Sequence, residues 1–284
     1  MEQATKSAII SLDIHKYMRT PHLESSRLQV GDEGHGQVPY AQHKGKYIVL
    51  EEKLDGGNCG VSFSAAGELL LQSRGHYLTG GGRERQFNLF KQWAVAHEGW
   101  MLERLEDRYV MYGEWMHKKH AMWYDALPHY FCEFDVLDKV TGKFLSTAAR
   151  RRLLADGPVL SVPVLYDGIA PPKLSDLWVL VKPSLGRTSQ WRRAFEAIVK
   201  REGLDVEKAW KQCDGSDRAE GLYGKVEEGD ETVDRFKLVR PDFVQAILDS
   251  EKHHAEQPFI PNLLRPGVDI FAPRLTHGWN AEPW

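Results

Sequence analysis

The residues of this chain that could do chemistry begin at Lys53, within the stretch EKLDGGN at positions 52–58. A lysine at the end of a predicted strand, followed by glycines, suits a nucleophile that meets a bulky phosphate ligand. Lysine attacks only as the neutral amine, and Glu52 and Asp55 would raise its pKa. Nearby cations or a bound metal would therefore have to lower it. A solvent-exposed turn would leave the same short pattern.

Later stretches place charged residues within or beside predicted strands. Arg74 ends one strand, and its planar guanidinium suits ribose or phosphate oxygens. Glu114 lies in an apolar strand, where a carboxylate is costly unless it is paired or used. Lys225 and Lys237 lie in two further predicted strands and could flank an anionic phosphate. For each of them alone, a solvent-facing side chain is an equally simple explanation.

Phe134 belongs to the stretch FCEFDV at positions 131–136, which alternates as a strand does. Its ring could stack on a purine or could be an ordinary core aromatic. Glu220 precedes the strand of Lys225, within the stretch EGLYGK. These stretches add an aromatic surface and another carboxylate to the candidate set.

Composition narrows the class of protein. The chain has 284 residues, an apolar content of 42% and a formal net charge of −3, which counts mildly against a nucleic-acid binder but allows a local basic channel. We expect no signal peptide and no membrane association, because no apolar run approaches about 20 residues. Three scattered cysteines without a CxxC pair predict a reduced, cytoplasmic setting.

The elements that must position these residues read as an α+β fold with an antiparallel sheet and flanking helices, since no regular βαβ alternation occurs. Glycine turns separate the first strands, and one long amphipathic helix is expected over Arg83–Leu105. The predicted strands are Tyr47–Glu52, Gly60–Ser64, Leu69–Ser73, Tyr109–Trp115, His129–Leu137, Gly221–Glu227 and Val233–Val239.

Three parts of the chain are expected. Residues 1–45 form a turn-rich N-terminal segment that packs on the core, and residues 46–240 form the main domain. Within it, residues 173–213 read as a helical insertion. Residues 241–284 form a short C-terminal extension that begins as a helix through Phe243, Ile247 and Leu248 and becomes irregular after Gln257.

Taken in order, these stretches resemble the motifs of the covalent nucleotidyltransferases, which comprise the ATP-dependent DNA and RNA ligases and the mRNA capping enzymes. Asn58, five residues after Lys53, is similar to the phage-type nick-sealing branch of the RNA ligases. The segment Tyr17–Leu23 and the run Lys237–Pro241 also resemble RNA ligases. The matching motifs are Lys53 with its glycines, Gly113-Glu114, Phe134-Asp135, Glu220-Gly221 with Lys225, and Lys237.

The resemblance implies an ATP-dependent RNA ligase that joins 3′-hydroxyl and 5′-phosphate ends through a lysyl-AMP intermediate on Lys53. It implies that Glu52 and Phe134 hold adenine, that Arg74 and Glu114 hold the ribose and nearby phosphate, and that Lys225 and Lys237 neutralise the α-phosphate. Mg²⁺ (or Mn²⁺) would be organised by Glu220, Asp55 and Asn58.

One departure concerns the last motif, where many relatives carry Lys-x-Lys. Val239 stands at the second position here, so Arg240 or Arg235 would supply the second cation. Many relatives also have an aliphatic residue in place of Tyr223. Both departures leave open which cation holds the phosphate.

Several alternatives remain open at this point. A DNA ligase, and a guanylyltransferase as a lesser option, are disfavoured because only 44 residues follow Arg240, too few for the oligonucleotide-binding barrel that DNA ligases usually append. Joining of mixed RNA–DNA strands stays open. A catalytically idle nucleotide- or RNA-binding module would keep the fold without the chemistry. The sequence does not identify the RNA that is joined, and a monomer is expected.

Overall fold

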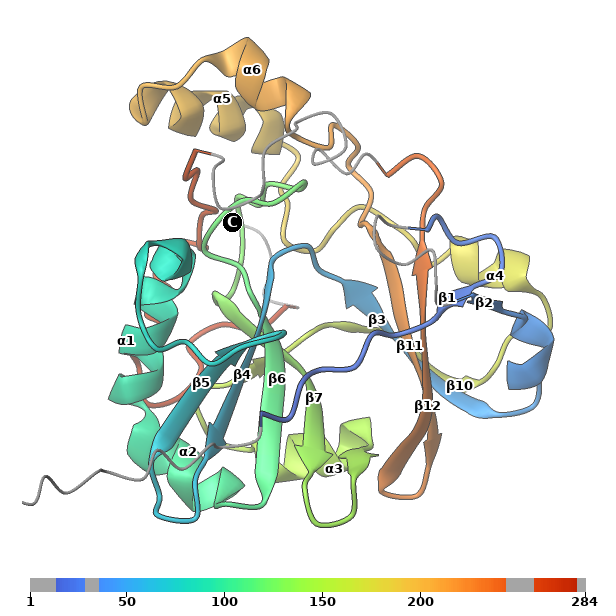
Figure 1. Ribbon diagram of the computed structural model, residues 1–284. Coiled ribbons are helices and arrows are strands. Elements are labelled where there is room, and N and C mark those ends of the chain that lie inside the picture. The colour runs from blue at the N-terminus through green and yellow to red at the C-terminus, as the bar shows by residue number, and fades with distance from the viewer. Residues whose placement is uncertain (1–13, 29–35, 244–257, 280–284) are drawn as a thin grey trace, which may run out of the picture.

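The computed structural model describes residues 14–28, 36–243 and 258–279. Among them, twelve strands form one sheet in the order β10-β3-β11-β12-β8-β7-β6-β4-β5, with β1, β2 and β9 paired at its sides (Figure 1). Most neighbours are antiparallel, whereas β1 runs parallel to β12 and β2, and β9 runs parallel to β7. The protein is therefore mixed α/β with a large, mainly antiparallel sheet, as expected.

The strands and helices have the following bounds. The strands are β1 His22–Leu23, β2 Gln37–Val38, β3 Tyr47–Lys53, β4 Gly57–Phe63, β5 Leu69–Ser73, β6 Tyr109–Trp115, β7 Phe131–Asp138, β8 Lys143–Leu145, β9 Leu160–Ser161, β10 Val164–Ile169, β11 Gly221–Glu228 and β12 Glu231–Val239. The α-helices are α1 Asn88–Ala96, α2 Glu98–Leu105, α3 Thr147–Leu153, α4 Leu174–Trp178, α5 Trp191–Arg201 and α6 Val206–Lys211, and the 3₁₀ helices are η1 Tyr40–His43 and η2 Gly82–Phe87.

Among the described strands, the two halves of the sheet are joined at two places: by the segment 160–169, whose strand β9 pairs with β7 and whose strand β10 pairs with β3, and by the short strand β8. This strand pairs with β12 at two positions and with β7 at two positions. Figure 1 shows β7 and β12 separating beyond this junction. A gap therefore opens between the half that contains β3, β11 and β12 and the half that contains β4, β5, β6 and β7.

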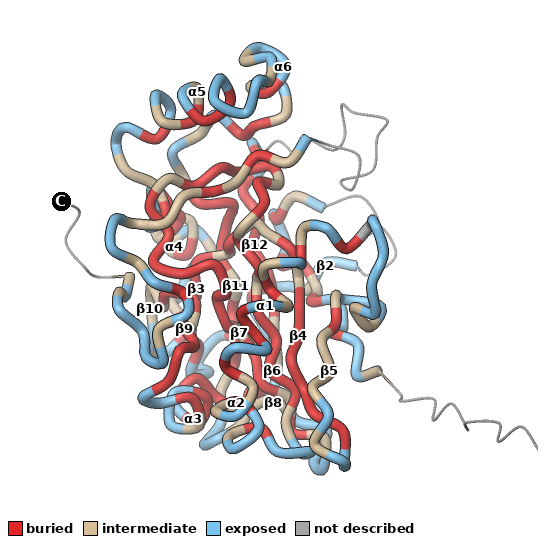
Figure 2. Tube along the Cα trace, turned by 90° about the vertical axis from the view of Figure 1, so that its left-hand side faces the viewer, coloured by how far each residue is buried: buried red, intermediate tan, exposed pale blue. Residues whose placement is uncertain are grey.

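Each half has its own hydrophobic core. Under β4, β6 and β7, the aromatic rings of Phe90 and Trp93 from α1 stack on Phe131 at centroid distances of 5.8 and 4.7 Å. Around β3, β11 and β12, a second cluster is built on Leu50 and Phe236. Figure 2 shows the central strands β3, β4, β6 and β7 as mostly buried and α5 and α6 as largely exposed on their outer side.

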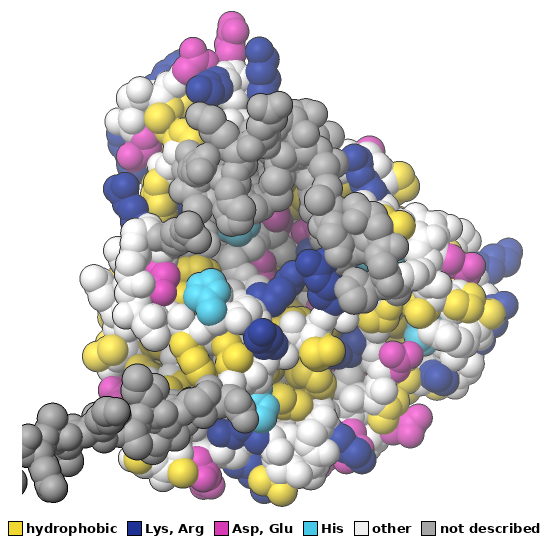
Figure 3. Space-filling model, viewed as in Figure 1, with side chains coloured by type: hydrophobic (Ala, Val, Ile, Leu, Met, Phe, Trp, Pro, Cys, Tyr) yellow, Lys and Arg dark blue, Asp and Glu magenta, His cyan; other side chains and the backbone are white. Residues whose placement is uncertain are grey.

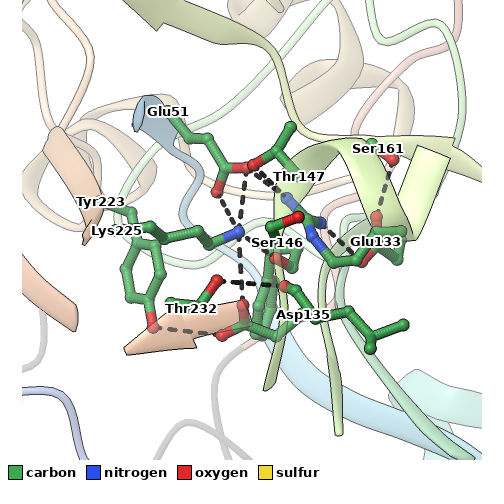
Figure 4. Close-up of polar contacts among 12 residues, drawn as sticks. Glu51, Glu133, Asp135, Ser146, Thr147, Ser161, Tyr223, Lys225 and Thr232 are labelled. Carbon is green, nitrogen blue, oxygen red and sulfur yellow. Dashed lines mark hydrogen bonds and ion pairs between the residues drawn. The ribbon is translucent and has the colours of Figure 1, made fainter. Parts of the chain in front are cut away.

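A buried ion bridge joins the two halves across the gap. The guanidinium of Arg150 in α3 donates to Glu133 of β7 at 2.6 Å and to Glu51 of β3 at 2.7 Å (Figure 4). All three side chains are at most 1% exposed. Because each half supplies one carboxylate, Arg150 holds the two halves together at this depth.

The same network continues toward the strand pair β11 and β12. Lys225 bonds to Glu51 at 2.8 Å and to Asp135 at 3.3 Å, and its ammonium also donates to the carbonyl of Phe134. Arg235 bonds to Asp135 at 3.1 Å. Burial acts to raise the pKa of Asp135, but these cations outweigh it and keep the pKa below its usual range. Three carboxylates and three cations thus balance.

The prediction of one continuous helix over Arg83–Leu105 is wrong. The segment is divided into η2, α1 and α2, and it breaks at His97, whose φ of −111° and ψ of 11° are not helical. The buried His97 ring is hydrogen-bonded by Nε2 to the carbonyl of Ile270 at 3.1 Å. A distant part of the chain, which local periodicity does not reveal, therefore holds the residue at the break.

Most other expected elements are present with shifted ends. Strand β4 begins at Gly57 rather than Gly60, and β7 begins at Phe131 rather than His129. Strands β8, β9 and β10 and helix α3 were not expected. Residues 258–279 are irregular as predicted, whereas the helix expected through Ile247 and Leu248 lies outside the described residues. No helix among the described residues is both long and apolar enough to cross a membrane.

The buried bridge generates a stability prediction. Arg150→Ala would leave Glu51 and Glu133 buried without their cation, so we expect the free energy of unfolding to fall by about 3–5 kcal/mol. Denaturation with urea, followed by circular dichroism, measures this. Arg152→Ala on the same helix is the control, because its ion pair with Asp230 is solvent-exposed and should contribute less than about 1 kcal/mol. Equal losses in the two variants would contradict the bridge.

Candidate active site

A pocket opens into the gap between the two halves of the sheet. It encloses about 650 Å³ of empty space, part of which is open to solvent. On the face that Figure 3 shows, Lys and Arg side chains gather beside a hollow that contains Asp and Glu side chains. The residues that line the pocket are Tyr17, Arg19, Thr20, Glu51, Glu52, Lys53, Leu54, Asn58, Arg74, Glu114, Phe134, Val162, Tyr223 and Lys237.

Lys53 stands at the end of β3, where its ammonium bonds to Glu220 at 2.7 Å. The two meet because Lys53 lies opposite Gly221, the residue after Glu220, in the pairing of β3 with β11. Gly221 allows a close approach to β12, since a Cβ atom there would lie 1.9 Å from the carbonyl oxygen of Leu238. The Glu-Gly pair of the sequence therefore presents a carboxylate to the lysine.

Glu114 and Asn58 face the same end of the pocket from neighbouring strands. They lie opposite each other in the pairing of β4 with β6. Glu114 accepts a hydrogen bond from the backbone N–H of Gly56 at 3.0 Å, and its pKa is raised to about 7, mainly by burial. The Oδ1 atom of Asn58 is buried and has no hydrogen-bond partner among the described residues. This oxygen is available to a ligand.

The charge around Lys53 is negative. Burial acts to lower the pKa of Lys53, but Glu220, Glu114 and Asp55 together outweigh it and raise the pKa. The pKa of Glu220 is raised as well, chiefly by burial. Lys53 is therefore an ammonium in this state, and the sequence-based objection to a neutral amine holds in the structure.

Aromatic side chains form part of the pocket wall. Phe134 is the extra residue where β6 pairs with β7, because Tyr112 pairs with Asp135 while the next residue, Gly113, pairs with Glu133. Its ring lies 5.1 Å from that of Tyr17, centroid to centroid, and Tyr223 also lines the pocket. These rings give the pocket an aromatic wall, and the hydroxyls of Tyr17 and Tyr223 donate to the buried Asp135.

Three cations other than Lys53 line the pocket: Arg19, Arg74 and Lys237. Arg74 lies just beyond β5, and Lys237 lies in β12 opposite Tyr223 of β11. They come from three separate parts of the chain, and together they give the pocket a partly positive rim.

Four of the predicted site residues are not part of the pocket lining: Asp55, Glu220, Lys225 and Arg240. Glu220 is buried behind Lys53 and bonds to its ammonium, whereas the other three have partners away from the pocket. Asp55 accepts a hydrogen bond from the backbone N–H of Met122 at 2.5 Å, so its carboxylate is turned to the 121–122 turn. Lys225 is fully buried in the ion network described above. Arg240 is also fully buried, and it pairs with Asp214 and donates to the carbonyl of Ala219. Packing against buried carboxylates removes both cations from the pocket.

Glu52 lines the pocket but its groups already have partners. Its backbone N–H donates to the carbonyl of Pro163 at 3.0 Å. Its carboxylate accepts from the hydroxyl of Ser184 at 2.5 Å and from the N–H of Leu185 at 3.1 Å. Burial raises the pKa of Glu52 to about 7. The backbone N–H of Glu52 is therefore not available to adenine. This removes one of the two backbone groups of Glu52 that could have made the adenine contact expected from the sequence.

Sequence reasoning gave no role to several residues at this site. Arg19 and Thr20 line the pocket, and the Tyr17 hydroxyl donates to Asp135 at 2.5 Å. The sequence singled out the segment that contains them only because it resembles RNA ligases. Arg150, which supports the floor of the site, gave no signal because it follows the strands by a dozen residues and appears as a surface arginine of an amphipathic helix.

A family model described as RNA ligase matches residues 46–239, which is more than half of the chain. A search of curated proteins found no match.

Among solved structures, Naegleria gruberi RNA ligase with PPi is similar at 18% identity and a TM-score of 0.46, covering 74% of this chain and 54% of that one. A variant of the same enzyme with AMP and Mn is similar at 17% identity and a TM-score of 0.48, covering 80% and 56%. The chain thus spans about half the length of these solved structures.

The buried Glu52 generates a pH prediction. Its folded-state pKa of about 7 lies above the ordinary value of 4.5, so its neutral form contributes stability below about pH 4.5 that is lost as the pH rises through 7. Glu52→Gln should therefore flatten the decline in the free energy of unfolding between pH 5 and pH 8 by up to about 3 kcal/mol. Urea titrations across this range measure it, and the exposed Glu103→Gln should leave the decline unchanged.

Proposed function

Because the chain belongs to the RNA ligase family, we propose that it joins RNA ends by forming a covalent lysyl-AMP on Lys53. The observation that carries this proposal is the position of Lys53. It ends a strand in a pocket whose lining also supplies carboxylates, an amide oxygen, further cations and aromatic rings, and its amine bonds to Glu220 at 2.7 Å. A nucleotide has matching parts: phosphates with bound metal, and a flat base.

In the proposed first step, Lys53 Nζ attacks the α-phosphorus of ATP. A phosphorus–nitrogen bond forms, the bond between the α-phosphorus and the bridging oxygen breaks, and pyrophosphate leaves. The ammonium must first lose a proton, and the carboxylate of Glu220, 2.7 Å away, is the base within reach. In such transfers, positioning and charge neutralisation matter more than acid–base catalysis.

A divalent metal fits the residues at this end of the pocket. Carboxylate and amide oxygens are the ligands that Mg²⁺ and Mn²⁺ prefer. Asn58 Oδ1, Glu114 and Glu220 would hold the ion, whereas Asp55 is engaged with the backbone of Met122. When bound, the ion would supply positive charge that favours the neutral amine of Lys53 and offsets the charge of the phosphates.

The remaining parts of ATP have candidate partners in the pocket. The adenine would lie against the ring of Phe134, with Tyr223 where relatives have an aliphatic residue. Arg74 would contact ribose or phosphate oxygens, and Lys237 would neutralise the α-phosphate. Among the cations suggested by sequence, Lys237 is therefore the one that we propose as a phosphate ligand, in place of Lys225 and Arg240.

In the later steps, the AMP passes from Lys53 to a 5′-phosphate of RNA, and a 3′-hydroxyl then attacks that phosphate and releases AMP. We propose the phage-type nick-sealing branch on the position of Asn58, whose free oxygen faces the nucleophile end of the pocket. We also propose that residues 46–240 form the nucleotidyltransferase domain. Residues 173–213 would be its helical insertion, with residues 1–45 and 241–284 as extensions.

The first experiment tests the covalent step. We expect α-labelled ATP with Mg²⁺ or Mn²⁺ to leave label on the denatured wild-type chain and none on Lys53→Arg. Arginine keeps the charge beside Glu220 but does not become a neutral nucleophile. Circular dichroism should show Lys53→Arg folded. Label retained on this variant would refute Lys53 as the nucleophile, and label on neither protein would favour an idle binding module.

A second experiment separates the two lysines of the last motifs. Lys237→Met should reduce the free energy of unfolding by less than Lys225→Met does and raise the KM for ATP in self-adenylylation by about tenfold or more. Lys225→Met should instead reduce the free energy of unfolding by about 3 kcal/mol or more, because Glu51 and Asp135 lose a buried cation. The reverse pattern would return Lys225 to the phosphate.

A further inference from the structure

The N-terminal strap, residues 14–28, crosses the face of the molecule that carries the pocket (Figure 1). At its start, the carbonyl of His15 accepts from Gln72 of β5 at 2.9 Å and from the hydroxyl of Tyr112 of β6 at 2.7 Å. Further on, the N–H of Lys237 in β12 donates to the carbonyl of Pro21 at 2.9 Å. The strap is thus attached to both halves of the sheet.

Buried side chains hold the strap and leave its charged side chains in solvent. Tyr17 and Thr20 are buried against the pocket, and Tyr17 donates to Asp135 at 2.5 Å. Lys16 and Arg19 are exposed, and Met18 is 67% exposed between them. Packing against the core accounts for the residue types at Tyr17 and Thr20. It does not account for the exposed cations Lys16 and Arg19 or for the exposed Met18.

Two neighbouring segments beside the pocket contain no acidic residue, although Glu24, Glu231 and Asp234 lie at the other end of the strap. The chain carries a net charge of −3, yet residues 14–23 contain no Asp or Glu, and neither do residues 69–83. These two segments are neighbours through the hydrogen bond between His15 and Gln72. Their exposed Lys16, Arg19 and Arg74, together with His15 and His76, form what we call the basic face.

The basic face is continuous with the pocket. Arg19 and Arg74 belong to both, since each is solvent-exposed and lines the pocket that contains Lys53. A polyanion lying on the basic face would therefore have its end near the nucleophile. By contrast, the cations of helix α5 alternate with Glu196 and Glu202, and Arg192 is paired with Asp217 at 2.7 Å.

We propose that the basic face binds the phosphate backbone of the RNA strand that is to be joined, with Met18 against a base. This inference rests on the proposed function and names the path of its substrate. Exposed cations neutralise backbone phosphates regardless of sequence, and an exposed thioether can contact any base. Lys16 lies outside the pocket lining, so its role concerns RNA and not ATP.

The test compares Lys16→Glu with the charge-conserving Lys16→Arg and with Lys200→Glu, an exposed position on α5. Binding of 5′-phosphorylated single-stranded RNA is measured by fluorescence anisotropy over a series of salt concentrations. We expect Lys16→Glu to raise the Kd about fivefold or more and to reduce the salt slope by about 0.7. Lys16→Arg and Lys200→Glu should bind as wild type does.

Self-adenylylation with labelled ATP is measured on the same variants and should be unchanged in Lys16→Glu. If wild type is labelled by AMP but Lys16→Glu binds RNA normally, the inference fails while the proposed function stands. Equal losses in Lys16→Glu and Lys200→Glu would indicate a general charge effect and would also overturn it. Wild type that is not labelled would refute the proposed function by a separate readout.

Discussion

The architecture depends on the buried bridge from Glu51 through Arg150 to Glu133. Among the described strands, backbone pairing joins the two halves of the sheet only through β8 and through the segment 160–169, so the side chains between the halves also set their separation. A buried charge without its partner is costly by several kcal/mol, and the bridge therefore defines a narrow range of spacings. Phe134 follows Glu133 directly and Glu52 follows Glu51, so the same contacts place residues of the pocket wall.

This constraint also explains why Lys225 and Lys237, which lie on adjacent strands, have different surroundings. Tyr223 pairs with Lys237 and Lys225 pairs with Arg235 in the register of β11 and β12. The pair of Tyr223 and Lys237 lies at the pocket, whereas the pair of Lys225 and Arg235, two residues further along the strands, lies in the ion network. Lys225 therefore acts on the carbonyl of Phe134 and on carboxylates of both halves, whereas Lys237 remains at the pocket.

The sequence predicted the local elements better than their relations. The strand that leads to Lys53 and the strands Leu69–Ser73 and Tyr109–Trp115 follow from alternation and glycine turns, and the antiparallel class follows from the absence of βαβ alternation. The break at His97, the extra residue at Phe134 and the burial of Lys225 depend on contacts between distant parts of the chain. Motif order alone grouped Lys225 and Arg240 with the pocket, because a motif does not show which partner a cation meets.

The carboxylates around Lys53 determine what the pocket can do at rest. With Glu220 at 2.7 Å and the pKa of Lys53 raised, the amine is a poor nucleophile until positive charge arrives. The same carboxylates repel the phosphates of a nucleotide that enters without a counterion. The carboxylates thus keep Lys53 protonated and disfavour phosphates that lack a counterion. A nucleotide that arrives together with a cation removes both effects at once. Reactivity is thereby tied to substrate binding, since Lys53 becomes a nucleophile only when its target is present.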